Sequence, residues 1–155
     1  MEYLSRYRVL HARVRPRSLV ASAQGGWHET AALLSGRRVL AVSGIADPSS
    51  FHEMLHEIDA DLVAVLEYPD HHSYTLGDWH TIAAAAREVD AVITTEKDLV
   101  KLERFPFARD SLYALRLEVS MPDEDARALD ELIFSRLHPP LSIDSAAQEV
   151  SRNAH

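Results

Sequence analysis

The middle of this 155-residue chain repeats one pattern three times: a short apolar run, a polar loop and an amphipathic segment. Strands are predicted at residues 38–42, 62–66 and 91–94, and helices at 48–58, at 76–89 and along a short segment with Leu99, Leu102 and Phe105. Strands that alternate with helices form parallel sheets with right-handed connections, so helices cover both faces. The sequence therefore predicts an α/β fold, a single domain with a mostly parallel, three-layer, Rossmann-like sheet.

Local signals mark where two of these helices begin. Asp47 is a residue type favoured at the N-cap of a helix, and Pro48 after it fits the first helical position. Thr75 and Asp78 have the spacing of a capping box, in which each side chain hydrogen-bonds the backbone of the other residue. These signals place the loops between each strand and its helix.

The two ends of the chain are less regular than its middle. A further strand is predicted at 112–117, a helix at 123–137 and an additional strand within 7–14, whereas 24–26 are expected to form a loop. The small polar residues after Ser142 are expected to fray. The predicted division of the chain is an N-terminal strand and connecting segment (1–36), an α/β domain (37–138) and a flexible tail (139–155).

Charge and composition exclude several classes of protein. The net charge is −8, which disfavours a chain that holds nucleic acid or an anionic membrane by bulk charge. Cysteine is absent, so neither disulfides nor thiolate metal sites are possible. No stretch approaches the 18 or so apolar residues of a transmembrane segment, and no secretory signal is recognisable at the start. We therefore expect a cytoplasmic protein.

Three polar loops follow predicted strands, at residues 43–48, 69–74 and 94–98. Because ligands of open parallel sheets bind beyond the carboxyl ends of the strands, we expect these loops to share one edge. That edge would gather Gly44, Asp70, His71, His72, Tyr74, Thr95, Glu96, Lys97 and Asp98. Loops between strands and helices are commonly polar, however, and Thr95 with Asp98 also has capping-box spacing, so spacing alone leaves a functional and a structural reading open.

Residues His52 to His56 match the helical zinc motif His-Glu-x-x-His. A catalytic zinc needs a third protein ligand, and the usual downstream histidine is absent, which would leave a residue such as Glu88 of the following helix. We favour the interpretation that both histidines lie on the solvated flank of their helix and that no metal binds. A zinc hydrolase is the less favoured alternative.

Nucleotide-binding motifs are absent from the sequence. None of the five glycines belongs to a G-x-x-x-x-G-K-[ST] or G-x-G-x-x-G pattern, so the chain has no recognisable cradle for nucleotide phosphates. Trp27 and Trp79 are expected to pack rather than to stack on a ligand. The arginines within 13–17 and at 37–38 are expected to be solvated.

Three ordered strings carry a resemblance to a known family: Ser43 to Pro48 with Phe51 and Leu55, Pro69 to Tyr74, and Thr94 to Asp98 with Val100 to Leu102. Together with the strand lengths between them, they resemble the C-terminal half of tetraacyldisaccharide 4'-kinase, the lipid A kinase. The resemblance extends over roughly residues 7–136.

The resemblance implies a two-domain, P-loop-type kinase that transfers the γ-phosphate of ATP to the 4'-hydroxyl of a lipid disaccharide at the inner membrane face. In that family the N-terminal domain carries the Walker A loop, the Mg²⁺-holding acids and most of the membrane contact, none of which is recognisable in this sequence. ATP and Mg²⁺ are therefore implied for the complete kinase and not for this chain alone. The implied partners are a P-loop kinase half and the lipid A disaccharide precursor, with a cytoplasmic, peripheral location at the inner membrane.

Site residues follow from matching positions in the family strings. His71 matches the histidine that works with an aspartate of the N-terminal domain to activate the acceptor hydroxyl, and Asp70 is expected to orient the loop or the imidazole. The expected cleft-lining residues, whose individual roles the resemblance leaves open, are Gly44, His72, Tyr74, Thr95, Glu96, Lys97 and Asp98.

Phosphoryl transfer depends on positioning and on charge stabilisation by Mg²⁺ and the phosphate-binding loop, so we expect no kinase activity from this polypeptide alone. A truncated gene, one half of a split kinase and a repurposed domain remain alternatives. A non-catalytic α/β module that binds an anion or a protein is the alternative function.

Overall fold

The computed structural model describes residues 8–21, 28–107 and 111–137. Within these residues the chain forms six strands, four α-helices and two short 3₁₀ turns. In chain order they are β1 (Arg13–Val20), β2 (His28–Thr30), η2 (Ala31–Leu34), β3 (Arg38–Ser43), α1 (Pro48–Glu57), β4 (Asp61–Glu67), α2 (Leu76–Ala85), η3 (Ala86–Glu88), β5 (Ala91–Thr95), α3 (Glu96–Leu102), β6 (Leu112–Ser120) and α4 (Asp123–Leu137).

The described chain divides into two compact units. One consists of residues 14–119 and contains the sheet with α1, α2 and α3, and the other combines residues 8–13 with 120–137. The predicted boundaries at residues 36 and 138 stay a prediction.

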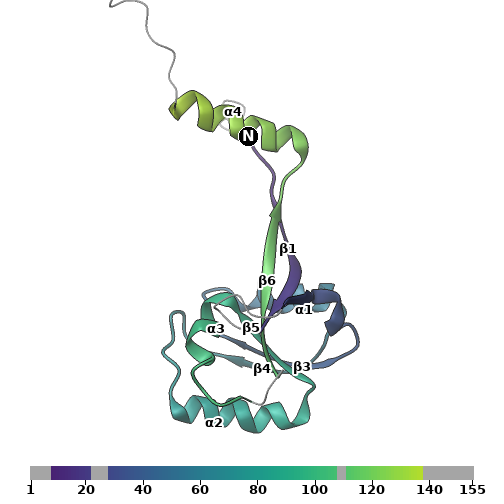
Figure 1. Ribbon diagram of the computed structural model, residues 1–155, viewed down its shortest axis with the longest axis vertical. Helices are drawn as coiled ribbons and strands as arrows, with labels where there is room; N and C mark the ends of the chain where they lie inside the picture. Colours follow the sequence, from purple (N-terminus) through teal and green to yellow (C-terminus); the bar gives the residue numbers. More distant parts are fainter. Residues whose placement is uncertain (1–7, 22–27, 108–110, 138–155) are drawn as a thin grey trace, which may run out of the picture. The chain divides into compact units, whose positions relative to one another are not determined.

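The sheet has the strand order β2-β1-β6-β5-β3-β4 (Figure 1). Strand β3 pairs in parallel with both β4 and β5, and β5 pairs in parallel with β6. Strand β2 is antiparallel to β1. The mostly parallel sheet that the strand and helix alternation predicted is therefore confirmed, with a short antiparallel pair at one edge.

Apolar side chains alternate between the two faces of the central strands, as strand geometry requires. On one face Val39 and Ala41 belong to a buried cluster with Phe51 and Leu55 of α1. On the other face Leu40 belongs to a cluster with residues of α2 and α3, among them Ile82, Leu99 and Leu102. Helices thus cover both faces of the sheet, with α1 and α2 on opposite sides in Figure 1.

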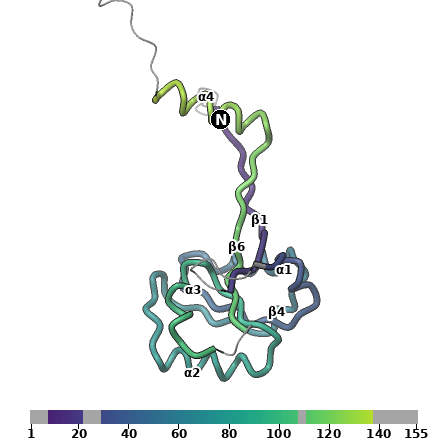
Figure 2. Tube along the Cα trace, viewed as in Figure 1, coloured from purple at the N-terminus to yellow at the C-terminus, as the bar shows by residue number. Residues whose placement is uncertain are grey.

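The predicted helix starts are observed. The Asp47 side chain accepts a hydrogen bond from the Ser50 backbone N–H, with Pro48 in the first turn of α1. Thr75 and Asp78 form both hydrogen bonds of the capping box that begins α2. Figure 2 lets the reader follow the chain from β4 through α2 to α3.

Several predicted boundaries are wrong. The first strand is not at 7–14 but at Arg13–Val20, because Leu19 and Val20 are buried in the core whereas Val9 is 56% exposed. Helix α2 stops at Ala85 and continues only as the 3₁₀ turn 86–88, and β2 with η2 was not predicted. The predicted loop at 24–26, Trp27 and the tail after residue 138 lie outside the described residues.

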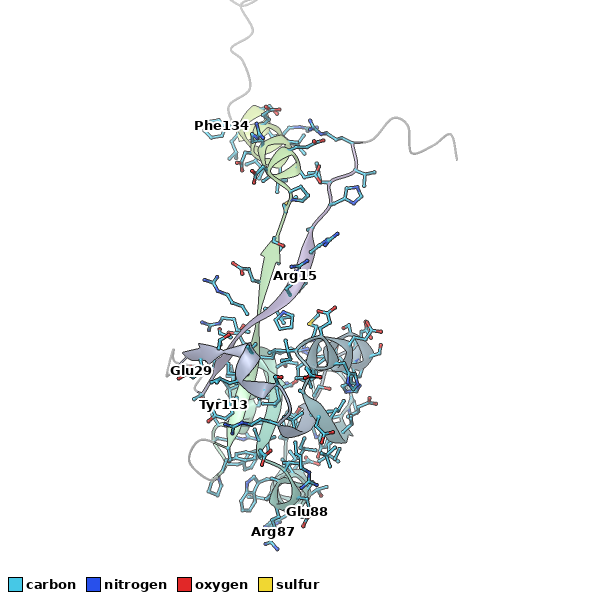
Figure 3. All side chains as sticks on the ribbon, turned by 90° about the vertical axis from the view of Figure 1, so that its right-hand side faces the viewer. Arg15, Glu29, Arg87, Glu88, Tyr113 and Phe134 are labelled. Carbon is cyan, nitrogen blue, oxygen red and sulfur yellow. The ribbon has the colours of Figure 1, made fainter. Side chains whose placement is uncertain are left out.

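The arginines of the two predicted clusters, at positions 13, 15, 17, 37 and 38, are exposed as expected. Figure 3 shows the Arg15 side chain projecting from β1.

In the unit formed by residues 8–13 and 120–137, the His11 backbone N–H donates to Asp125 Oδ2 at 3.0 Å. Asp125 and Ala128 are buried, whereas Phe134 is exposed on the outside of α4 (Figure 3). No helix within the described part of the chain is both long enough and apolar enough to span a bilayer.

Candidate functional site

Three loops that are far apart in the sequence meet at the carboxyl edge of the sheet. The Gly44 backbone N–H, after β3, donates to Asp98 Oδ2 in the first turn of α3 at 2.9 Å. The Gly44 carbonyl accepts from the His71 N–H, in the loop after β4, at 3.3 Å. The expectation that the loops around Gly44, His71 and Glu96 share one edge is therefore confirmed.

Asp98 lies at the base of this site and is completely buried. Its Oδ2 also accepts from the Thr95 hydroxyl at 2.8 Å, and its Oδ1 lies 3.4 Å from the ammonium of Lys101. A buried carboxylate is costly unless it is paired and hydrogen-bonded, and these contacts meet that requirement. Asp98 thus ties the loop after β3 to helix α3.

Gly44 is confined by its neighbours. A Cβ at this position would lie 3.2 Å from Asp98 Oδ1, 3.3 Å from the Pro69 carbonyl oxygen and 3.3 Å from the Tyr74 hydroxyl. These distances are shorter than most van der Waals contacts, so a side chain would push against both loops. The absence of a side chain lets the loops approach each other.

Tyr74 completes the buried base. Its side chain is among the most buried of the described part of the chain, and within that part its hydroxyl has no hydrogen-bond partner. Burial raises the pKa of Tyr74 well above its usual value, and the nearby Asp98 carboxylate adds to the rise. The Tyr74 side chain is therefore neutral and packs in the base of the site. The backbone carbonyl of Tyr74 accepts a hydrogen bond from the Arg104 guanidinium.

Asp70, His71 and Lys97 form an exposed group above this base. Lys97 Nζ lies 2.6 Å from Asp70 Oδ1, and Asp70 Oδ2 lies 3.6 Å from His71 Nε2. The hydrogen bond from Lys97 lowers the pKa of the Asp70 carboxyl below its usual range. Asp70 therefore stays ionised at neutral pH beside the imidazole.

His71 has the geometry of a presented side chain. Its imidazole is 79% exposed, and its backbone φ of 59° lies in the left-handed region that few non-glycine residues adopt. Two acceptors hold the His71 backbone N–H, Asp70 Oδ1 at 2.9 Å and the Gly44 carbonyl at 3.3 Å. This turn directs the ring away from the packed base into solvent.

The side chain of His72, unlike that of His71, packs against neighbouring residues. Its Nε2 lies 3.0 Å from Asp78 Oδ2, and its ring stacks on Tyr68 with centroids 4.8 Å apart. The hydrogen bond with His72 lowers the pKa of Asp78, and the Thr75 N–H contributes further. His72 thus anchors the loop to the start of α2.

Of the remaining candidates, Thr95 has a structural position and Glu96 has a peripheral one. The Thr95 hydroxyl accepts from the Asp98 N–H and so caps α3. Glu96 points to β6 instead, where its Oε1 lies 2.7 Å from the Arg116 guanidinium.

The two histidines of the zinc-like motif differ from each other. His56 is exposed as expected, but His52 is only 18% exposed, so its predicted solvation is wrong. The ring of His52 lies beside Phe51, and its buried Nε2 is 3.9 Å from Glu67 Oε1. Across residues 8–21, 28–107 and 111–137, no three His, Asp or Glu side chains are grouped to hold a metal ion.

Sequence reasoning assigned no role to Lys101, which is central to the site. Its ammonium donates to the His72 carbonyl at 2.9 Å and also contacts Asp98. The available signal was its spacing of four residues from Lys97, which places both on one face of a helix.

Comparison with known proteins identifies the family. The family model described as LpxK, tetraacyldisaccharide-1-P 4'-kinase, matches residues 2–138. The chain belongs to this family. A tetraacyldisaccharide 4'-kinase from Methylorubrum extorquens is 41% identical over 107 residues, which cover 68% of this chain. One from Syntrophus aciditrophicus is 33% identical over 118 residues, which cover 75% of this chain.

The match covers only part of the length of each relative. This chain spans about 30% of the length of the Methylorubrum kinase and 31% of the Syntrophus kinase. A crystal structure of LpxK from Aquifex aeolicus in complex with ATP matches with a TM-score of 0.53 and 21% identity, over 85% of this chain and 40% of that one. At that identity the likeness supports the shared fold alone.

Proposed function

We propose that this chain supplies the acceptor side of a tetraacyldisaccharide 4'-kinase and acts together with a P-loop portion that binds ATP. The single observation that carries the proposal is the exposed imidazole of His71, held at the carboxyl edge of the sheet in a chain of this family. The proposed acceptor is the 4'-hydroxyl of a lipid A disaccharide precursor, so the working enzyme would lie at the cytoplasmic face of the inner membrane.

The proposed reaction forms one bond and breaks another. The 4'-oxygen bonds to the γ-phosphorus of ATP, and the bond between that phosphorus and the β–γ bridging oxygen breaks, with its electron pair leaving in ADP. The proton of the 4'-hydroxyl passes to a ring nitrogen of His71, because an imidazole can accept a proton near neutral pH. Asp70 faces the imidazole and would stabilise its protonated form.

ATP phosphates and Mg²⁺ do not fit the residues that the structure describes. The sequence contains no P-loop motif, and the described residues group no three acidic or histidine side chains for a metal. Charge stabilisation of the transferred phosphate is therefore assigned to the P-loop portion, and this chain alone should not transfer phosphate.

A chimeric kinase tests the proposal. The segment of the Methylorubrum kinase that aligns with this chain is replaced by the corresponding residues of this chain, and transfer of labelled phosphate from ATP to the disaccharide is measured. We expect a chimera that phosphorylates the disaccharide, because the grafted segment keeps the site and the host keeps the P-loop. The host kinase without its aligned segment is the negative control.

A chimera that unfolds cooperatively at a temperature close to that of the host kinase, yet transfers no phosphate above this control, would overturn the proposal. The isolated chain is assayed in parallel and should remain inactive.

A further inference from the structure

Lys97 forms an ion pair with Asp70, the residue directly before His71. Its ammonium reaches from α3 to Asp70, 27 positions earlier in the chain, with Nζ 2.6 Å from Oδ1. The same carboxylate oxygen accepts the His71 backbone N–H, and the other oxygen faces the His71 ring at 3.6 Å. A displacement of Asp70 would therefore move the backbone and the imidazole of His71.

This ion pair contributes little to folding. The side chains of Lys97 and Asp70 are 39% and 40% exposed, and exposed ion pairs are typically worth a small fraction of the stability of a protein. The loop of Asp70 is also tied to α3 through buried Gly44, whose carbonyl accepts the His71 N–H and whose N–H donates to buried Asp98. A function other than stability therefore explains the Lys97 contact better.

Two neighbouring side chains of α3 are committed elsewhere. Lys101, one turn further along, donates to the His72 carbonyl and contacts Asp98. Glu96 pairs with Arg116. Lys97 is the side chain of this helix that contacts Asp70 in the structure.

We propose that Lys97 is a positioning residue for phosphoryl transfer: it fixes the Asp70 carboxylate, and Asp70 fixes the turn and ring of His71. The inference rests on the proposed function and extends it to a residue that does not touch the acceptor. The ammonium of Lys97 also balances the negative charge of the Asp70 carboxylate.

The first arm of the test uses the full 155-residue chain. Carboxyl ¹³C shifts report the titration of Asp70, and amide exchange reports the protection of the His71 N–H. In Lys97→Met the pKa of Asp70 should rise toward its usual value, because the hydrogen bond that lowers it is lost. The His71 N–H should exchange faster, and Lys97→Arg should restore both properties. Unchanged Asp70 titration in Lys97→Met would overturn the proposed contact.

The second arm uses the active chimera. Lys97→Met should lower kcat by about tenfold to a hundredfold, since small displacements of a catalytic group cost rates of this size, and KM should change by less than about twofold. Lys97→Arg should recover most of the loss. Arg17→Met removes another exposed ion pair, that with Glu118, and should leave kcat unchanged.

The outcomes separate the two proposals. An active parent chimera with unaltered kcat in Lys97→Met overturns the positioning role alone, and so does a raised KM at constant kcat, which would indicate direct binding of substrate. A folded but inactive parent chimera overturns the proposed function and the catalytic meaning of Lys97 with it, while the first arm still establishes whether Lys97 holds Asp70.

Discussion

The base and the rim of the site lie at the same edge of the sheet but differ in burial and in the kind of contact they make. The base, formed by Gly44, Tyr74 and Asp98, is buried and held by short contacts. The rim, formed by Asp70, His71 and Lys97, is exposed and held by a surface ion pair. Only two residues lie between His71 and Tyr74, so one loop contributes to both the base and the rim.

We infer from this difference that the base stabilises the fold and that the rim serves catalysis. An unpaired buried polar group costs folding energy, whereas a broken exposed ion pair costs little. Substitutions in the base should therefore change the free energy of unfolding, and substitutions in the rim should change catalysis at nearly constant stability. The following substitutions test this contrast, in order of decreasing effect on stability.

Asp98→Ala should have the largest effect, a loss of about 3 kcal/mol in the free energy of unfolding. The substitution leaves the buried Gly44 N–H without its acceptor and removes the carboxylate that faces the half-buried Lys101 ammonium. Urea unfolding followed by circular dichroism measures the loss. Asp98→Asn keeps part of the hydrogen bonding and should lose less, and an Asp98→Ala protein as stable as the parent would contradict the importance of the base.

Gly44→Ala should destabilise the protein by about 2 kcal/mol, the usual cost of overpacking a tight site. The added methyl group pushes against Asp98, the Pro69 carbonyl and the Tyr74 hydroxyl. Thermal unfolding measures the change, and Gly77→Ala is a matched control because a Cβ at Gly77 meets only Thr75 Oγ1, at 3.5 Å. Equal effects of the two substitutions would show that the approach of the loops at Gly44 is not constrained.

Asp78→Ala should cost about 1 kcal/mol at pH 7, a typical value for a helix cap, since it removes the capping box of α2. The pKa of Asp78 is lowered in the folded protein, chiefly by His72, so this stabilisation is complete above the unfolded pKa and is lost as the pH falls through the folded pKa. The difference between parent and variant should therefore shrink below about pH 4. Urea unfolding at pH 7 and pH 3 checks this, and a difference that grows at pH 3 would refute it.

His71→Gly should have the smallest effect, within about 0.5 kcal/mol of the parent, because the side chain is exposed. Glycine adopts the left-handed φ of this position without strain, and this gain offsets the greater freedom of glycine in the unfolded chain. Thermal unfolding of His71→Gly and His71→Asn measures both effects. A loss above about 2 kcal/mol would show that the rim supports the fold as strongly as the base does.

Much of this arrangement could be predicted from the sequence because it follows from local and topological rules. The alternation of strands and helices places the loops after β3, β4 and β5 at one edge, and Thr75 with Asp78 marks the start of α2. Contacts between distant residues could not be predicted in this way. Thr95 and Asp98 have the spacing of an ordinary exposed cap, and the burial of Asp98 depends on Gly44, 54 positions earlier.

The rim shows the same limit. The sequence indicates His71 through family resemblance, but the pairing of Lys97 with Asp70 depends on the registers of β4 and β5 against β3, which lies between them, and spacing does not give these registers. The position of the first strand is wrong for a related reason: alternation at 7–14 predicts a strand, but β1 begins at Arg13.

The most direct test of the proposed role of His71 is the rate of 4'-phosphorylation by the chimera with His71→Asn, compared with the parent chimera at matched thermal stability. Asparagine tolerates the left-handed turn but cannot accept the proton, so the account predicts a rate at least about a hundredfold lower. A rate within twofold of the parent would contradict the assignment of His71 to the acceptor hydroxyl.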